Sequence, residues 1–159
     1  MTTTAGSHSV LVLGLGNLLL SDDGVGLRLL AELAGSAEAD FVDGGTQGLA
    51  LLPYLADRRA IVILDAVALG APPGTVHVLE GNSLDSIRAR TAHESNASEL
   101  LAAARLLGDL PPTVVIVGIE PARVATGVGL SAEVEAAIPE AAARAREVLP
   151  DVVAGAGAG

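Results

Sequence analysis

The sequence predicts an α/β fold, a three-layer sandwich in which helices cover both faces of a mostly parallel sheet. Short uninterrupted apolar runs, typical of strands buried on both faces, occur at residues 10–15, 60–64 and 114–119. Segments with the apolar spacing of helices separate these runs. Regular alternation of strands and helices is the pattern of a parallel sheet with helices on each side.

In the first half of the chain, a helix is predicted over residues 25–33, where apolar side chains recur at positions 25, 29, 30 and 33. A short strand is predicted at 39–43, stopped by two glycines, and residues 49–55 indicate a short helix that contains Pro53. The apolar run at 60–64 leads directly to Asp65. In this half of the chain, each predicted strand therefore ends in, or is followed directly by, glycine or aspartate.

In the second half, residues 75–79 alternate like a strand with one wetter face, and 97–107 form an amphipathic pattern preceded by possible caps at Ser95 and Asn96. Ser131 is expected to cap a final helix that runs to about residue 149 and is kinked or split at Pro139. These elements make one domain over 9–150. Residues 1–8 and the Ala/Gly-rich residues 151–159 are expected to be flexible tails.

Composition excludes several classes of function. The 159 residues suffice for one typical domain, and the absence of cysteine excludes disulfides, thiolate metal sites and cysteine nucleophiles. Nine basic residues, all arginine and scattered, face 19 acidic ones, so binding to nucleic acid or an anionic membrane surface is not expected. With no basic residue ahead of the first apolar run, and no apolar stretch long enough to span a bilayer, we expect a cytoplasmic protein.

The loop after the first strand argues for a cation rather than a nucleotide. Ligand sites in such sheets gather beyond the carboxyl ends of the strands. A dinucleotide loop needs a third glycine where this chain has Leu19, and the loop is several residues too long. It also ends in Asp22 and Asp23, whose charges would repel a phosphate at the helix N-terminus. A nucleotide-binding α/β domain is therefore the less favoured alternative.

Three carboxylates follow successive strands, and a histidine lies in a later loop. Asp23, Asp43 and Asp65 stand at these strand ends, with His93 in the stretch Thr-Ala-His-Glu-Ser. Crowded carboxylates repel each other, and a divalent cation converts that repulsion into affinity. Two carboxylates and one imidazole form a ligand set suited to nickel, zinc, iron or manganese.

Each of these residues also has an ordinary structural interpretation. Asp22 and Asp23 can cap the first helix, Asp65 can satisfy a backbone turn, and His93 can be a solvated loop residue. Glu94 and Glu120 lie near the same strand ends but are not assigned a function, and neither are His8 and His77.

Several motifs occur together in the chain. They are Gly14-x-Gly16-Asn17, Asp22-Asp23-Gly24-x-Gly26, Asp43-Gly44-Gly45-Thr46-x-Gly48, Asp65 after Ile-Val-Ile-Leu, His93, and Val-Val-Ile-Val-Gly-Ile before Glu120-Pro121. In this combination the chain resembles the hydrogenase maturation endopeptidases over nearly its whole length apart from the tails. The combination is far more specific than any single motif.

The resemblance implies a function, a substrate and a set of site residues. The family removes a short C-terminal peptide from the large subunit of a nickel–iron hydrogenase after nickel insertion. The implied metal-contacting positions are Asp23, Asp65 and His93. Asp43 is a candidate for substrate positioning or catalysis. The implied metal is nickel, as carried by the large-subunit precursor, and we expect zinc or another divalent metal to substitute in vitro.

The resemblance also implies a five-stranded mixed sheet with one antiparallel strand. Residues 75–80 fit this antiparallel strand. It leaves the chemistry of hydrolysis open between a metal-polarised carbonyl or water and Asp43 acting as general base. Direct attack by water is favoured, because no side-chain nucleophile stands out. A nickel-binding maturation chaperone without protease activity would use the same three ligands and remains an alternative.

Overall fold

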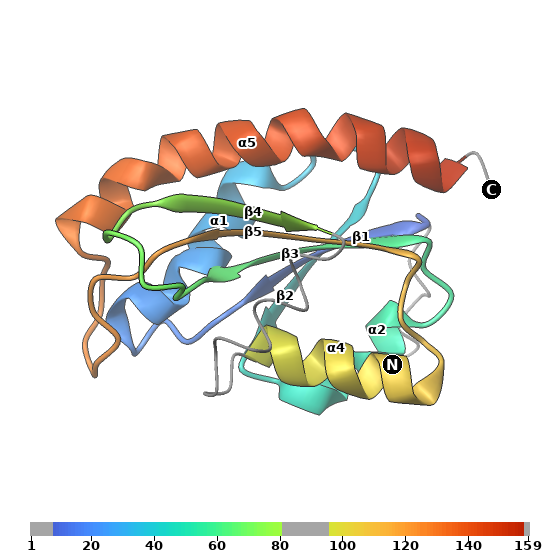
Figure 1. Ribbon diagram of the computed structural model, residues 1–159, viewed down its shortest axis with the longest axis horizontal. Coiled ribbons are helices and arrows are strands. Elements are labelled where there is room, and N and C mark those ends of the chain that lie inside the picture. Colours follow the sequence, from blue (N-terminus) through green and yellow to red (C-terminus); the bar gives the residue numbers. More distant parts are fainter. Residues whose placement is uncertain (1–7, 81–95, 158–159) are drawn as a thin grey trace.

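The structure confirms the predicted sandwich and its single antiparallel strand. The computed structural model describes residues 8–80 and 96–157. Its sheet has five strands in the order β2-β1-β3-β5-β4 (Figure 1). The pairs β1–β2, β1–β3 and β3–β5 are parallel, whereas β4 runs antiparallel to β5. The strands are β1 (Val10–Leu15), β2 (Asp40–Gly45), β3 (Ala60–Ala66), β4 (Val76–Glu80) and β5 (Thr113–Ile119).

Helices cover both faces of the sheet. Packed against one face are α1 (Val25–Leu33) and α5 (Ala132–Gly157), while the other face is covered by η2 (Gly48–Leu51), α2 (Leu52–Leu55) and α4 (Asn96–Leu107) (Figure 1). The cores on the two sides are almost purely aliphatic. Within residues 8–80 and 96–157, no helix is long and apolar enough to cross a membrane.

The last helix differs from the sequence-based expectation. The expected split at Pro139 is wrong, because α5 is one helix that contains both Pro139 and Pro150. Pro139 lies on the exposed side of α5, where water can bond the carbonyl that proline leaves without a helical partner. The helix continues to Gly157 and buries Val152 against the core, so the flexible tail expected over 151–159 does not hold for residues 151–157.

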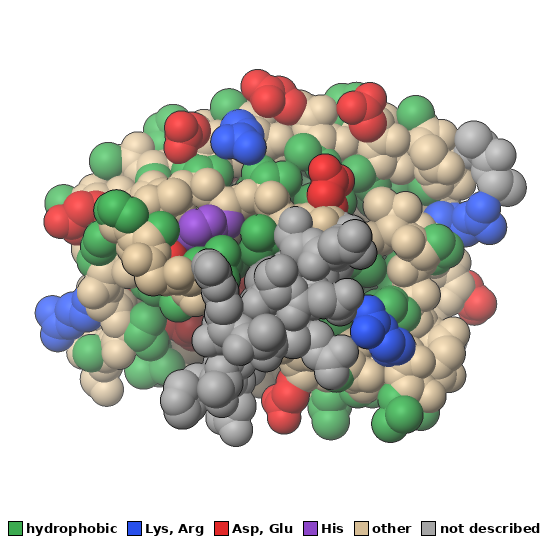
Figure 2. Space-filling model, in the orientation of Figure 1, with side chains coloured by type: hydrophobic (Ala, Val, Ile, Leu, Met, Phe, Trp, Pro, Cys, Tyr) green, Lys and Arg blue, Asp and Glu red, His purple; other side chains and the backbone are tan. Residues whose placement is uncertain are grey.

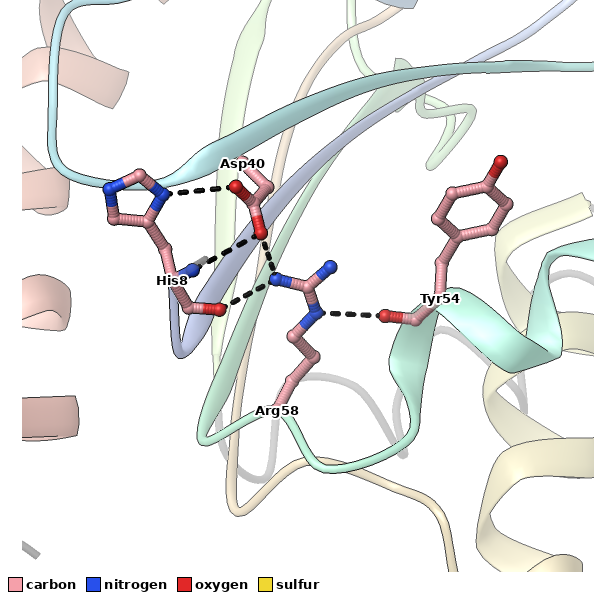
Figure 3. Close-up of polar contacts among 4 residues, drawn as sticks. All are labelled: His8, Asp40, Tyr54 and Arg58. Carbon is pink, nitrogen blue, oxygen red and sulfur yellow. Dashed lines mark hydrogen bonds and ion pairs between the residues drawn. The ribbon is translucent and has the colours of Figure 1, made fainter. Parts of the chain in front are cut away.

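The start of the described chain is also anchored rather than free. His8, assigned to the 1–8 tail from the sequence, pairs through Nδ1 with Asp40 Oδ1 at 2.9 Å (Figure 3). The buried Arg58 donates to the other Asp40 oxygen, to the His8 carbonyl at 2.6 Å and to the Tyr54 carbonyl at 2.9 Å. Burial raises the pKa of Asp40, but the hydrogen bonds from Arg58 and His8 outweigh it and hold that pKa below its ordinary value. This cluster ties the amino ends of β1 and β2 to the turn before β3.

The parallel strands all end on the side of the sheet opposite that cluster. We call this side the carboxyl edge; it is where β1, β2, β3 and β5 end, at Leu15, Gly45, Ala66 and Ile119. The first turn of α4 and the segment leading into α5 lie at the same side (Figure 1).

Helix α1 approaches this edge so closely that it requires a glycine. A Cβ added at Gly26 would lie 2.3 Å from the carbonyl oxygens of both Leu15 and Leu64. Because both neighbours are backbone atoms of buried strands, α1 would have to move away from the sheet to make room.

Gly26→Ala is therefore expected to lower the free energy of unfolding by about 1–3 kcal/mol, the usual cost of an extra methyl group in a packed region. Gly155→Ala is the matched control, since Gly155 is an exposed helical glycine with no atom within 4 Å of an added Cβ. That control should leave stability unchanged or raise it by less than about 1 kcal/mol. Denaturant unfolding followed by circular dichroism measures both. Equal stabilities would show that α1 can shift without cost.

Candidate functional site

Asp23 is brought to the carboxyl edge by a tight loop after β1. It lies in the 3-10 turn η1 (Ser21–Gly24), is half-buried, and accepts a hydrogen bond from the Asn17 amide at 2.9 Å. The loop closes on itself at Gly16, which has a φ of +136° and where an added Cβ would lie 2.0 Å from the Asp23 carbonyl oxygen. Only glycine therefore fits at position 16, where the loop passes this close to the Asp23 backbone.

Asp65 ends strand β3 and is almost fully buried, with 5% of its surface exposed. Desolvation raises its pKa well above the ordinary value, and the negative charge of Asp23 raises it further. A hydrogen bond from the Ala66 amide to Oδ1, at 2.8 Å, opposes this only in part. The structure thus brings Asp23 and Asp65 close enough for their charges to interact. A cation placed against both carboxylates would relieve the repulsion.

Asp43 lies at the same edge but on the other face of the sheet from Asp65. Side chains alternate along a strand, and Phe41 packs with the core beneath α1, so Asp43 shares that face. Asp65 lies two residues beyond Ile63 on β3 and so shares the face of Ile61 and Ile63, which belong to the core beneath α4. Asp43 is exposed, so its carboxylate is open to solvent.

The third ligand implied by the resemblance, His93, lies outside the described residues, as does Glu94. Across 8–80 and 96–157, no group of three or more His, Asp or Glu side chains is arranged to hold a metal ion. The described chain therefore supplies two of the implied ligands, and the role of His93 stays a prediction.

Asp22 has a structural role that the sequence did not reveal. It is completely buried, and its two oxygens accept bonds from four donors. These donors are the Ala122 amide at 2.9 Å, the Arg123 amide at 2.9 Å, the Ser131 amide at 2.7 Å and the Ser131 hydroxyl at 2.8 Å. Helix α1 begins after Gly24 without a side-chain cap, so the helix-capping role considered for Asp22 and Asp23 is wrong.

A second buried acid, Glu120, organises the connection between β3 and β4. Its Oε1 accepts bonds from the Leu69 amide at 2.9 Å and the Ala71 amide at 3.1 Å, and lies 3.1 Å from Nε2 of His77. From the sequence, no function was assigned to Glu120 or His77. Their positions in the sequence do not reveal this contact, because it depends on β4 lying antiparallel beside β5.

Asp22 makes stability depend on pH. Burial raises its pKa, but the four hydrogen bonds from Ser131, Arg123 and Ala122 outweigh burial and hold the pKa below the ordinary 3.8. Ionised Asp22 therefore stabilises the fold fully above the unfolded pKa, and this contribution is lost as pH falls through the lower, folded pKa.

Asp22→Asn is expected to lower the free energy of unfolding at pH 7 by about 1.5–3 kcal/mol, because an amide nitrogen cannot accept bonds from these donors. The difference from wild type should begin to shrink below about pH 4, where the Asp22 carboxylate of the unfolded chain takes up a proton, and disappear as pH falls through the lower pKa of the folded protein. Urea unfolding at a series of pH values measures it. The exposed Asp151→Asn in α5 serves as the control and should match wild type throughout. A constant difference across pH would contradict the role of the ionised carboxylate.

Comparisons with known proteins agree on one family. The family model described as "Hydrogenase maturation protease" matches residues 26–148. The "Hydrogenase 2 maturation protease" of Escherichia coli is 32% identical over 139 residues, covering 83% of this chain and 85% of that protein. HupD of Rhodobacter capsulatus, a "Hydrogenase expression/formation protein", is 34% identical over 119 residues, or 70% of this chain. The chain spans 57% and 54% of the lengths of HupD from R. capsulatus and Thiocapsa roseopersicina.

Solved structures of such proteins share the fold. The maturating endopeptidase HybD from E. coli has a TM-score of 0.79 and 30% identity, covering 89% of this chain and 92% of that one. The [NiFe] hydrogenase maturation protease HybD from Thermococcus kodakarensis has a TM-score of 0.72 and 28% identity, with 88% and 98% covered. The sequence matches and the shared architecture agree: this chain belongs to the hydrogenase maturation protease family.

Proposed function

We propose that this protein is an endopeptidase that removes a C-terminal peptide from the nickel-loaded precursor of a nickel–iron hydrogenase large subunit. Membership of the maturation protease family supports the reaction class. The single observation that carries the proposal is the burial of Asp65 beside Asp23 at the carboxyl edge. A buried carboxylate next to a second acid is costly unless a cation joins them.

In this proposal the metal belongs to the substrate. Asp23 and Asp65 contact the nickel held by the precursor, with His93 as the third contact. The set is incomplete for a metal of its own, which suits an enzyme that must approach an ion already bound by another protein. Zinc or another divalent ion bound to the precursor would offer the same carboxylates a partner in vitro. The protein acts in the cytoplasm.

For hydrolysis we favour direct attack by water on the peptide carbonyl. Asp43 is the proposed general base. It is exposed, lies near the carboxyl edge, and belongs to β2, where pairing with Gly14 of β1 fixes its backbone. A base needs hydrogen-bond reach to the attacking water, about 2.6–3.2 Å between heavy atoms, and an exposed carboxylate leaves space for both water and substrate.

The test is the intact mass of a nickel-loaded large-subunit precursor after incubation with the protein. Wild type should remove one defined C-terminal peptide. Asp23→Asn, Asp65→Asn and His93→Ala should each slow cleavage by about 100-fold or more, since even an outer-shell partner of a metal ligand is typically worth 10–100-fold. Asp151→Asn is the matched control, an exposed aspartate on α5 that should retain full activity. A nickel-free precursor should remain intact.

Asp65→Asn separates the site from the fold. Because Asp65 is buried with a raised pKa, replacing it by a neutral isostere removes a desolvated acid and should not lower the free energy of unfolding at pH 7. The expected variant is folded and inactive. Unimpaired cleavage by Asp23→Asn would contradict the ligand assignment. Tight nickel binding by the free protein, with no cleavage of any precursor, would instead identify a nickel-binding maturation chaperone.

A further inference from the structure

Exposed apolar side chains gather on two loops at the carboxyl edge. Large hydrophobic side chains that are more than half exposed are few among the described residues, and four of them lie here. Leu18 and Leu19, 52% and 63% exposed, follow β1, while Val124 and Val128, 53% and 86% exposed, follow β5. We call these four side chains the apolar rim. We propose that the apolar rim is the surface on which the hydrogenase large-subunit precursor docks, an inference that rests on the proposed function.

Backbone hydrogen bonds join the two loops into one surface. The Ser21 amide donates to the Gly127 carbonyl at 2.9 Å, and the Gly127 amide donates to the Leu19 carbonyl at 2.9 Å. Leu20 and Gly127 form a parallel bridge, and the Ser21 hydroxyl donates to the Ala125 carbonyl at 2.8 Å. The apolar rim is therefore held in place before any partner arrives, so little ordering entropy is lost on binding.

The charge of the rim differs from that of the whole protein. The chain carries a net charge of −10, and acidic side chains are spread along α5 (Figure 2). Residues 16–21 and 121–131 contain no acid, and their one charged residue is the exposed Arg123. The acids next to these segments are the buried Asp22 and Glu120 and the half-buried Asp23. At this end of the molecule Figure 2 shows hydrophobic side chains and a basic group, together with an acidic group near the start of α5. Such a surface fits an apolar patch of a folded protein bordered by a carboxylate facing Arg123.

The position of the rim explains what docking would achieve. Leu19 precedes Asp23 by four positions in the same loop, and the second loop is fixed to Asp22 through the Ala122 and Arg123 amides. A precursor seated on the rim therefore has its metal next to the carboxylates. Binding at a distance from the reacting bond serves to orient the substrate.

The experiment compares glutamate substitutions on and off the rim. Leu19→Glu and Val128→Glu place a charge in the contact without disturbing a core, because both side chains are mostly exposed. Leu106→Glu is the matched control: its side chain is 88% exposed, close to the 86% of Val128, and it lies in the last turn of α4, away from the carboxyl edge (Figure 1). Binding of the nickel-loaded precursor and the steady-state KM and kcat are measured for each variant.

Each rim variant should raise both Kd and KM by about tenfold or more, the loss expected for an anchor of a protein interface. Its kcat should stay within twofold of wild type, and Leu106→Glu should match wild type in all three quantities. Unchanged Kd and KM in both rim variants, or an equal rise in Leu106→Glu, would overturn the docking surface while leaving the protease intact. If wild type binds the precursor without cleaving it, the proposed function fails and Kd alone decides the docking surface. Absence of both binding and cleavage overturns both.

A second copy of this chain is the competing occupant of the rim. Light scattering after size exclusion distinguishes it, because a self-association face would make wild type a dimer and both rim variants monomers. That result with unchanged KM would overturn docking of the precursor.

Discussion

The buried carboxylate of Asp22 is the interaction on which the carboxyl edge depends. It holds the turn before α1 together with the segment after β5 and the start of α5, although the turn lies about a hundred residues before the other two in the sequence. A fully buried charge is tolerable only when its oxygens are saturated by donors, and here four donors saturate them. The arrangement leaves the neighbouring Asp23 free for a different purpose.

The adjacent Asp22 and Asp23 thus have different roles: a carboxylate whose oxygens are fully bonded within the fold cannot also bind an external cation. Asp22 is fully bonded within the protein and holds the fold. Asp23 accepts one bond from Asn17 and keeps capacity for a further partner, beside the poorly solvated Asp65. The fold leaves the negative charge of Asp23 and Asp65 only partly balanced, and such a site commonly binds a cation.

The regular parts of the fold were predictable because their signals are local. The helix at 25–33 was predicted with the bounds that the structure shows, and the apolar runs gave the buried strands. The end of α5 was not predictable, since Ala/Gly composition resembles a flexible tail and only packing of Val152 and Ala156 against the distant core makes it helical. The antiparallel direction of one strand was predicted only from the family resemblance.

The site was predictable only in part, for the same reason. Aspartates at strand ends pointed to the carboxyl edge, but nothing in the sequence separates the roles of Asp22 and Asp23. That difference is decided by amide donors after β5. The opposite faces of Asp43 and Asp65 follow from strand register, which the sequence alone leaves open.

The anchoring of His8 by Asp40 and Arg58 has a practical consequence for handling the protein. Both His8 and the end of α5 lie on the side of the sheet where the parallel strands begin, away from the candidate site (Figure 1). A molecule attached to a surface through either of these ends would present Asp23, Asp65 and the apolar rim to the solution. Immobilised protein and fusion partners at these ends are thus compatible with access by a large folded substrate.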